Sequence, residues 1–354
     1  MRCPTLSELP PPPPDKTGWP WTEERPQLPD LMPDGSAWPC ISIVTPSYNQ
    51  GQFIEETIRS VLLQSYPNLE YIVIDGGSTD NSVEIIKKYQ EHLAFWSSEP
   101  DRGQTDAINN GYQHCTGDIF VWLNSDDLYY NPLVLKTVAD LFLKGYDYIS
   151  GECFYIDENG NQRLERVTDS EVLRNQLKLD GKSIPTTFNK LLRYWSGNNN
   201  FMQPATFVSK ELTDLCFPLD PELYYAMDYQ LFIRVLKRNP KAIWIREKLV
   251  RFRWHSTSKT MGDIAAESEL YKVSLAESRA LSTWWEHALF KRQASDFEDL
   301  LCLIHGQTFP QLWQVLIHLV YRPTSIASIL FWKVFFKAAI GVESYSLLRK
   351  LAGK

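Results

Sequence analysis

The sequence has 354 residues, of which 44% are hydrophobic and 13% aromatic, and its net charge is -7 at pH 7. A chain of this size can bury one large core, with or without an appendage. The acidic balance argues against a nucleic-acid partner, because nucleic-acid recognition relies on basic surface. The six cysteines show no paired spacing, so we expect reduced thiols, no zinc site and a cytoplasmic location.

Residues 1–39 are rich in proline and tryptophan, as in "LPPPPPDKTGWPWTEERPQLPDLMPDG". Such a segment forms neither regular helix nor sheet. We expect an extended arm that either lies on the following domain or is disordered. A secretory signal would need a basic start and an apolar centre, so no signal peptide is expected.

Over residues 40–260, apolar runs of strand length alternate with amphipathic helical segments. Strands are expected at Ile41–Thr45, Leu69–Ser78, Leu93–Asp101 and Asp118–Asp127. Helices are expected at Phe53–Leu62, Asp80–Gln90, Gln104–His114 and Pro132–Gly145. This alternation predicts an α/β fold with a mostly parallel central sheet covered by helices on both faces.

Each predicted strand is followed by small, polar or acidic residues: "TPSYN", "DGGSTD", "SEPDRG" and "NSDD". In parallel sheets ligands bind beyond the carboxyl ends of the strands, so these four tips predict one shared crevice. A dinucleotide site would need G-x-G-x-x-G after the first strand. The sequence there is "TPSYNQGQ", which argues against a nicotinamide cofactor.

The segment "WLNSDD" places Asp126 and Asp127 directly after a buried strand. Two adjacent carboxylates repel each other unless a cation or several donors offset the repulsion. The alternative is that they cap the helix expected near Pro132, but they lie too far before it to cap it well. The pair therefore predicts a cation at the end of this strand.

Three segments in order carry a family resemblance: "SIVTPSYNQGQFIEETIRSVLLQSYPNLEYIVIDGGSTDNS", "DRGQTDAINNG" and "GDIFVWLNSDD". Together they resemble the family 2 nucleotide-sugar glycosyltransferases of GT-A fold, over about residues 40–260. The resemblance implies transfer of a sugar from a nucleoside diphosphate sugar, with a UDP-sugar favoured, to a saccharide or lipid-linked acceptor. It also implies Mg²⁺ or Mn²⁺, an inverting reaction, and a role in polysaccharide or glycoconjugate biosynthesis.

By this resemblance, Asn124 and Ser125 lie along the ribose and diphosphate, and Asp126 is a metal ligand. Asp127 contacts the waters of the metal or the donor sugar. Asn124 departs from the fullest form of the D-x-D element, which has aspartate there. An amide adds no charge, so we expect a lower metal affinity. His255, in "RFRWHSTSKT", either approaches the metal or diphosphate or is a satisfied histidine without a ligand.

The resemblance assigns Asp75 to the nucleobase or ribose; the alternative is a turn aspartate that bonds the amides of "GGSTD". Thr45 and Pro46 would close over the base. Tyr48 would offer its ring face to the base, or else pack in the core.

In "DRGQTDAINNG" the resemblance assigns Asp101 and Arg102 to the donor, and Gln104 could bond a sugar hydroxyl. The alternative for Asp101 and Arg102 is a surface ion pair between the two, which would contribute little stability. In "NNNFMQPATFVSKEL" the resemblance implies an acceptor-side strand, with Gln203 and Pro204 facing the site.

An inverting transfer needs a base that deprotonates the acceptor hydroxyl. The resemblance assigns it to Asp228 in "PELYYAMDYQLFIRVLKR", with Glu222 as the fallback; the alternative is a first-turn helix aspartate without a catalytic role. The helix dipole would stabilise this carboxylate and lower its basicity. The apolar face of the helix is expected from Tyr224, Met227, Leu231 and Val235.

Residues 261–354 are expected to form a helical C-terminal extension. From residue 306 onward the net charge is +5, which points to an acidic partner surface. In "SIASILFWKVFFKAAIGV", Lys333 and Lys337 interrupt the apolar run, so a spanning helix is not expected. The segment either lies peripherally on an anionic membrane or packs on the catalytic domain.

Other classes fit less well. A glycosidase needs two carboxylates on opposite sides of the scissile bond, which adjacent Asp126 and Asp127 do not provide. A nucleotidyltransferase would need a Gly-rich basic loop where "PSYNQGQ" stands. The main non-enzyme alternative is a noncatalytic relative that acts as a partner in a membrane-bound assembly complex.

Overall fold

The computed structural model describes residues 1–163, 202–256, 258–259 and 264–278. The chain divides into two compact units, residues 1–187 with 201–261, and residues 188–200 with 262–354. In the second unit the described part is the helix α9, Ile264–Glu277. The first unit contains the sheet and every residue proposed above for the site.

The sheet of the first unit has strands in the order β3-β2-β1-β4-β7-β6-β8-β5. Their bounds are β1 Ile41–Ser47, β2 Leu69–Asp75, β3 Phe95–Ser98, β4 Ile119–Trp122, β5 Leu128–Tyr129, β6 Tyr148–Ile156, β7 Thr206–Ser209 and β8 Ala242–Arg253. The neighbours β3, β2, β1 and β4 are parallel. Beyond β4 the sheet is mixed, because β7 runs antiparallel to both β4 and β6, while β6 and β8 are parallel.

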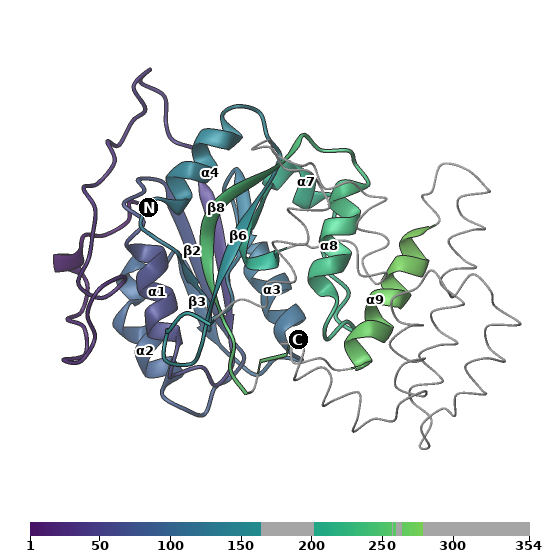
Figure 1. Ribbon diagram of the computed structural model, residues 1–354, viewed down its shortest axis with the longest axis horizontal. Helices are drawn as coiled ribbons and strands as arrows, with labels where there is room; N and C mark the ends of the chain where they lie inside the picture. The colour runs from purple at the N-terminus through teal and green to yellow at the C-terminus, as the bar shows by residue number, and fades with distance from the viewer. Residues whose placement is uncertain (164–201, 257, 260–263, 279–354) are drawn as a thin grey trace, which may run out of the picture. The chain divides into compact units, whose positions relative to one another are not determined.

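The helices of the first unit follow the strands in the predicted alternation. They are α1 Ile54–Leu62, α2 Ser82–Lys88, α3 Gln104–Gln113, α4 Val134–Phe142, α7 Lys210–Asp214 and α8 Met227–Leu236. Figure 1 shows α1 and α2 on one side of the sheet and α3 and α8 on the other. The predicted α/β architecture, with helices on both faces, is confirmed.

Strand β1 lies in the middle of the parallel part and is buried along its whole length. Its register places Ser47 beside Asp75 at the end of β2, and Val44 beside Trp122 at the end of β4. The carboxyl ends of these strands therefore lie at one edge of the sheet, as expected for parallel strands. Polar residues that follow them are brought together there.

The N-terminal arm, residues 1–39, lies on the first unit. Trp19, Trp21 and Trp38 are buried, and the backbone of Cys3 donates to the carbonyl of Tyr66. The arm also contains a short 3-10 helix at Leu6–Glu8, which the proline-rich composition did not predict. Burial of large aromatic rings explains why an arm with little regular structure adheres to the domain.

Tyr224 differs from its predicted place. Helix α8 begins at Met227, so Tyr224 precedes the helix, and it is 52% exposed rather than part of an apolar face. The prediction for this residue is wrong because the helix begins three residues after Tyr224, so Tyr224 does not share the face of the helix.

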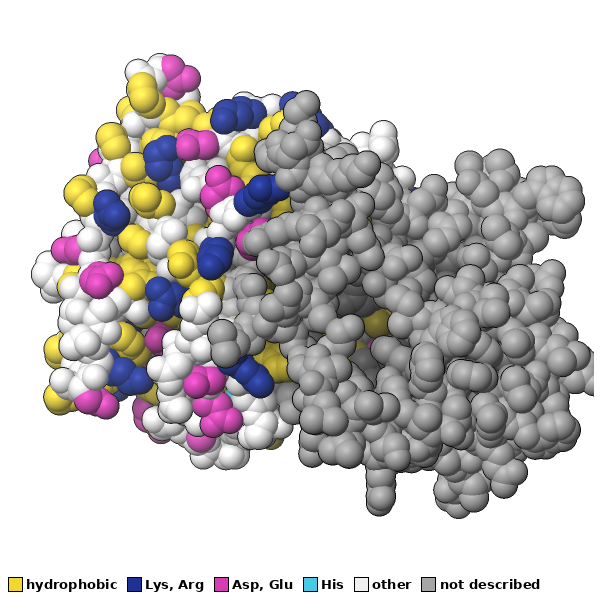
Figure 2. Space-filling view, in the orientation of Figure 1, with side chains coloured by type: hydrophobic (Ala, Val, Ile, Leu, Met, Phe, Trp, Pro, Cys, Tyr) yellow, Lys and Arg dark blue, Asp and Glu magenta, His cyan; other side chains and the backbone are white. Residues whose placement is uncertain are grey.

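On the face shown in Figure 2, the described residues carry Lys and Arg side chains interspersed with Asp and Glu. Within the described ranges, no helix is both long and apolar enough to cross a membrane. The basic stretch from residue 306 onward, with Lys333 and Lys337, lies outside the described residues.

Candidate active site

Asp126 and His255 meet at the carboxyl edge of the sheet. Asp126 follows β4, and His255 follows β8. The Nε2 atom of His255 lies 2.9 Å from Oδ2 of Asp126, and the Asp126 side chain remains 21% exposed. The two residues predicted as metal ligands are therefore in direct contact, with the carboxylate open to solvent.

Asp127 points into the protein, away from solvent. It is 1% exposed, its Oδ1 accepts the backbone N–H of Arg253 at 2.9 Å, and its Oδ2 accepts the side-chain amide of Asn124 at 3.4 Å. Burial, with the Asp126 charge adding to it, raises the pKa of Asp127 well above its usual range. The two adjacent carboxylates thus have different environments, one solvated and one enclosed by donors.

Arg253 holds the turn that carries both carboxylates, and the sequence analysis did not single it out. It is 2% exposed; its Nε donates to the carbonyl of Asp126, and its second guanidinium nitrogen contacts Glu56 at 2.5 Å. Arg253 is the last residue of β8, and its contacts reach residues distant in the sequence, which no local pattern indicates.

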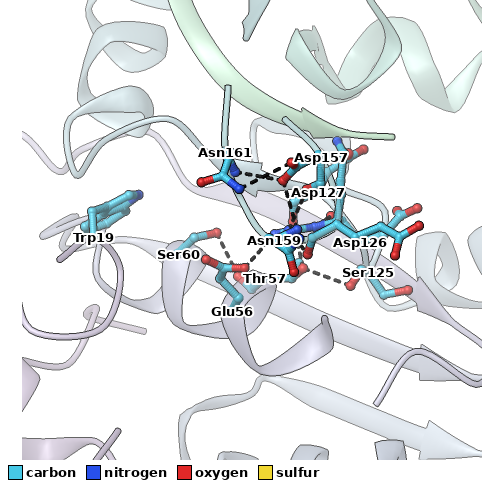
Figure 3. Close-up of polar contacts among 12 residues, drawn as sticks. Trp19, Glu56, Thr57, Ser60, Ser125, Asp126, Asp127, Asp157, Asn159 and Asn161 are labelled. Atoms are coloured by element: carbon cyan, nitrogen blue, oxygen red, sulfur yellow. Dashed lines mark hydrogen bonds and ion pairs between the residues drawn. The ribbon is translucent and has the colours of Figure 1, made fainter. Parts of the chain in front are cut away.

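Helix α1 also forms hydrogen bonds with the turn that carries Asp126 and Asp127. The hydroxyl of Thr57 is within hydrogen-bonding distance of the carbonyls of Ser125, at 2.9 Å, and Asp127, at 2.6 Å. Figure 3 shows Thr57 and Glu56 of α1 below the turn of Asp126 and Asp127. The backbone of Ser125 is thereby fixed, and Ser125 itself is buried. These are long-range contacts that no local pattern predicts.

Hydrogen bonds between amide side chains link Gln104, the first residue of α3, to the turn at residues 124–127. Gln104 donates to Asn124 at 2.8 Å, and Asn124 donates to the Oε1 of Gln203 at 3.3 Å. Gln203 in turn donates to the backbone carbonyl of Trp122. Asn124 is therefore held between three partners, including Asp127, by hydrogen bonds that an aspartate could make only in part, since a carboxylate cannot donate.

Asp75 is engaged in its own turn. It accepts the backbone N–H groups of Gly77 and Ser78, at 3.2 and 2.8 Å, and the hydroxyls of Ser78 and Ser98, at 2.5 and 2.7 Å. This is the geometry of the alternative weighed from the sequence, an aspartate that bonds the amides after it. Its side chain also lines the pocket described below.

The end of β1 shows one exposed and two enclosed residues. Thr45 is buried, with its hydroxyl 3.1 Å from that of Tyr71. Pro46 is paired in register with Ile74. Tyr48 is 60% exposed, so the alternative of a core tyrosine is wrong.

Arg102 pairs with Asp106 rather than with Asp101. Its Nε and second guanidinium nitrogen contact the two oxygens of Asp106 at 2.5 and 2.6 Å. Asp101 instead accepts the backbone N–H of Gly103, and burial raises its pKa. The proposed Asp101–Arg102 surface pair is therefore wrong, because the helical spacing of four residues suits the arginine better.

A pocket of about 490 Å³ lies beside the ends of β2 and β3, along α3, and against residues 218–221. Asp75, Asp101 and Arg102 line it, whereas Gln104 and the turn at residues 124–127 do not. The residues predicted to bind the donor thus form two groups, one around this pocket and one around Asp126 and His255.

Asp228 lies in the first turn of α8, as predicted. Its Oδ1 accepts the following backbone N–H, of Tyr229, at 2.6 Å. Burial nevertheless raises its pKa to about 7, and Lys259 acts in the opposite direction. The expected loss of basicity is therefore wrong, because desolvation outweighs the helix terminus. Glu222, the fallback, is exposed.

The donor set at Asp126 and His255 suits a divalent cation. A carboxylate oxygen suits both Mn²⁺ and Mg²⁺, whereas an imidazole nitrogen suits first-row transition metals better than Mg²⁺, so this pair would favour Mn²⁺. Asp126 and His255, whose Oδ2 and Nε2 atoms lie 2.9 Å apart, are the residues that would hold such an ion. Within the described ranges, no group of three or more His, Cys, Asp or Glu side chains that could hold a metal ion occurs.

Comparison with known proteins identifies the family. The profile of "Glycosyl transferase family 2" matches residues 42–201. An uncharacterized glycosyltransferase of Mycobacterium tuberculosis is 39% identical over 109 residues, which are 30% of this chain and 42% of that protein. An uncharacterized glycosyltransferase of Rickettsia typhi is 38% identical over 224 residues, 63% of this chain and 66% of that protein.

Among solved structures, TarS 1-349 of S. aureus in complex with UDP-GlcNAc has the same fold, with a TM-score of 0.57 at 17% identity. The match covers 87% of this chain and 92% of that one. It supports the predicted GT-A fold. The chain spans less than half the length of the M. tuberculosis relative, and within it residues 42–201 carry the family profile. Through these residues the chain belongs to glycosyl transferase family 2.

Proposed function

We propose that this protein transfers a sugar from a nucleoside diphosphate sugar to a saccharide or lipid-linked acceptor, with inversion. The observation that carries the proposal is the contact between Asp126 and His255, 2.9 Å apart, at the sheet edge of a family 2 domain. A divalent cation held by these two residues would offset the negative charge of the departing diphosphate. A UDP-sugar is the first donor to test, since the S. aureus protein of the same fold was crystallised with UDP-GlcNAc.

The remaining site residues have distinct roles in this proposal. Asn124, held by Gln104 and Gln203, would lie along the ribose and diphosphate of the donor. Asp127 fixes the turn from inside. Tyr48, exposed beside the end of β1, offers its ring to the nucleobase, and Asp75 and Arg102 would line the donor side through their pocket.

Asp228 is the proposed base. With a pKa of about 7, its carboxylate can take a proton near neutral pH, where general bases are most effective. The acceptor oxygen would form its bond to the anomeric carbon as the bond to the diphosphate breaks on the opposite face. The hydroxyl proton would go to Asp228. The acceptor, in polysaccharide or glycoconjugate biosynthesis, is proposed from the family.

The test is thermal unfolding of the wild type and of Asp126→Asn with UDP or GDP, each with and without Mn²⁺. A ligand that binds the native state stabilises it, by about 2.7 kcal/mol at 100 times Kd. We expect UDP with Mn²⁺ to raise the Tm of the wild type and to leave Asp126→Asn unchanged. Asp140→Asn, at an exposed ion pair of α4, is the matched control and should behave as wild type.

Failure of both nucleotides to shift the wild type would contradict the proposal and favour the noncatalytic alternative. A rise in Tm that does not depend on Mn²⁺ would support nucleotide binding and contradict the proposed role of the metal.

A further inference from the structure

The turn that carries Asp126 continues into β5, and both backbone groups of Tyr129 in that strand are held from outside the sheet. The N–H of Tyr129 donates to the hydroxyl of Ser60, on α1, at 3.1 Å. The carbonyl of Tyr129 accepts the indole N–H of Trp19 at 2.8 Å. Trp19 belongs to the N-terminal arm, so the arm touches the chain three residues after the proposed metal ligand.

Helix α1 also forms hydrogen bonds directly with the turn at residues 125–127. Thr57 lies one turn before Ser60 and contacts the carbonyls of Ser125 and Asp127. Figure 3 shows Thr57 and Glu56 below this turn, Ser60 beside them, and Trp19 farther to the left. Residues 125–129 are therefore held by successive contacts from α1 and by one from the arm.

Arg59 joins the arm to α1. Its side chain is fully buried, and its guanidinium donates to the carbonyls of Pro10, Pro20 and Trp21 at 2.8 to 3.2 Å. A buried guanidinium is stabilised only when its donors are satisfied. The arm supplies three of these acceptors, so arm and helix form one supporting layer behind the site.

We propose that Trp19 of the arm is a positioning residue, which fixes residues 125–129 through the carbonyl of Tyr129 and so holds Asp126 in place for the cation. This inference rests on the proposed function. Outer partners that orient a metal ligand commonly change metal affinity by 10- to 100-fold. The effect of Trp19, which acts through the backbone, is expected near the lower end.

The experiment compares Trp19→Phe with Trp38→Phe in the full chain. Each substitution keeps an aromatic ring and removes one indole donor from a buried tryptophan. The partner of Trp38 is the carbonyl of Pro29, within the arm, so this control loses a similar bond without contact to residues 125–129. Two quantities are measured: the Mn²⁺ concentration for half-maximal stabilisation by UDP, and amide hydrogen exchange of residues 124–131 without ligand.

For Trp19→Phe we expect the half-maximal Mn²⁺ concentration to rise by about tenfold and exchange in residues 124–131 to become faster. Trp38→Phe should change neither. Equal values for the two variants would overturn the inference, as would faster exchange with an unchanged Mn²⁺ requirement, since that result is purely structural. If Trp19→Phe does not fold, Ser60→Ala removes the other hold on Tyr129 and should give the same two changes.

The two readouts separate the inference from the proposed function. A wild type that shows no Mn²⁺-dependent stabilisation contradicts the proposed function, and with it the part of the inference that concerns the cation. The exchange comparison then still decides whether Trp19 orders residues 124–131. A wild type that responds to Mn²⁺, together with a Trp19→Phe variant that matches it, contradicts the inference alone.

Discussion

Asp228 has two opposing influences on its carboxylate. The first turn of α8 favours the charged form, whereas burial disfavours it and wins, giving a pKa of about 7. An aspartate in water has a pKa near 4 and would be a weaker base. Burial thus makes Asp228 more basic than an exposed aspartate, which supports its proposed role as the base.

Replacement of Asp228 by asparagine should remove the proton acceptor and leave the donor site intact. We expect kcat to fall by about 10²- to 10⁴-fold while UDP stabilisation with Mn²⁺ remains as in the wild type. Glu222→Gln, at an exposed residue of the same segment, should keep near wild-type activity. Full activity of Asp228→Asn would assign the base elsewhere.

Lys259 tunes the same carboxylate. Its charge lowers the pKa of Asp228, and it lies near Gln104, at 3.0 Å, and over the ring of Tyr224. Tyr148 is the other titratable group that interacts with Asp228, and it is neutral near pH 7. Lys259 therefore lowers the pKa of Asp228 through its charge, in addition to the backbone N–H of Tyr229, which donates to the carboxylate.

Lys259→Met should shift the pH profile. The base acts when deprotonated, so activity rises with pH through the pKa of Asp228, about 7. Loss of the lysine charge raises that pKa, and the acidic limb of the kcat profile should move to higher pH. Lys237→Met, at the C-terminal end of α8, is the control. A limb that stays in place, or moves to lower pH, would contradict the assignment of Asp228.

The site residues next to strand ends could be predicted from the sequence. The residues that hold them in place through hydrogen bonds could not. The pattern of strand tips indicated Asp126 and Asp127, and the resemblance indicated His255 and Asp228. Arg253, Thr57 and Trp19 act on backbone groups up to 127 positions away in the chain. Such contacts have no local period, so sequence reasoning had no signal for them.

At the scale of elements, α3 packs against the sheet with unusual closeness. A Cβ added at Gly111 would lie 2.5 Å from Cγ1 of Val44 in β1. The absence of a side chain lets the helix approach the central strand, and the start of α3 carries Gln104 toward Asn124. Helix placement and donor-site geometry are thus linked through one glycine.

Gly111→Ala should destabilise the protein. Overpacking against Val44 costs about 1–3 kcal/mol, partly offset by the roughly 1 kcal/mol gain in helix propensity. We expect the free energy of unfolding in urea to fall, by up to about 2 kcal/mol. Asn110→Ala, at the exposed neighbour on the helix, should not lower it. An unchanged or more stable Gly111→Ala would show that α3 can shift without cost.

Sequence patterns predicted elements best in the parallel half of the sheet. Strands β1 to β4 and helices α1 to α4 were found because continuous apolar runs and helical periods are local features. The two-residue strand β5 is too short for such a pattern. The positions of β6, β7 and β8 result from pairing between distant segments, with register shifts near Gly151, and alternation alone does not give that order.

For the whole molecule, the arm contributes to the stability of the domain. Arg59→Met should leave the carbonyls of Pro10, Pro20 and Trp21 without their donor. Each buried unsatisfied group costs about 1–3 kcal/mol, so we expect a loss of at least about 3 kcal/mol in urea unfolding. Arg25→Met, at an exposed arginine of the arm, should change stability by less than about 0.5 kcal/mol.

The place of the arm also has a consequence for synthesis of the chain. Domains form as the ribosome releases them, from the N-terminus onward. Tyr129, the partner of Trp19, follows it by 110 residues, and the helix that carries Arg59 lies between them. During synthesis the indole of Trp19 therefore stays without this partner until most of the parallel sheet has been made.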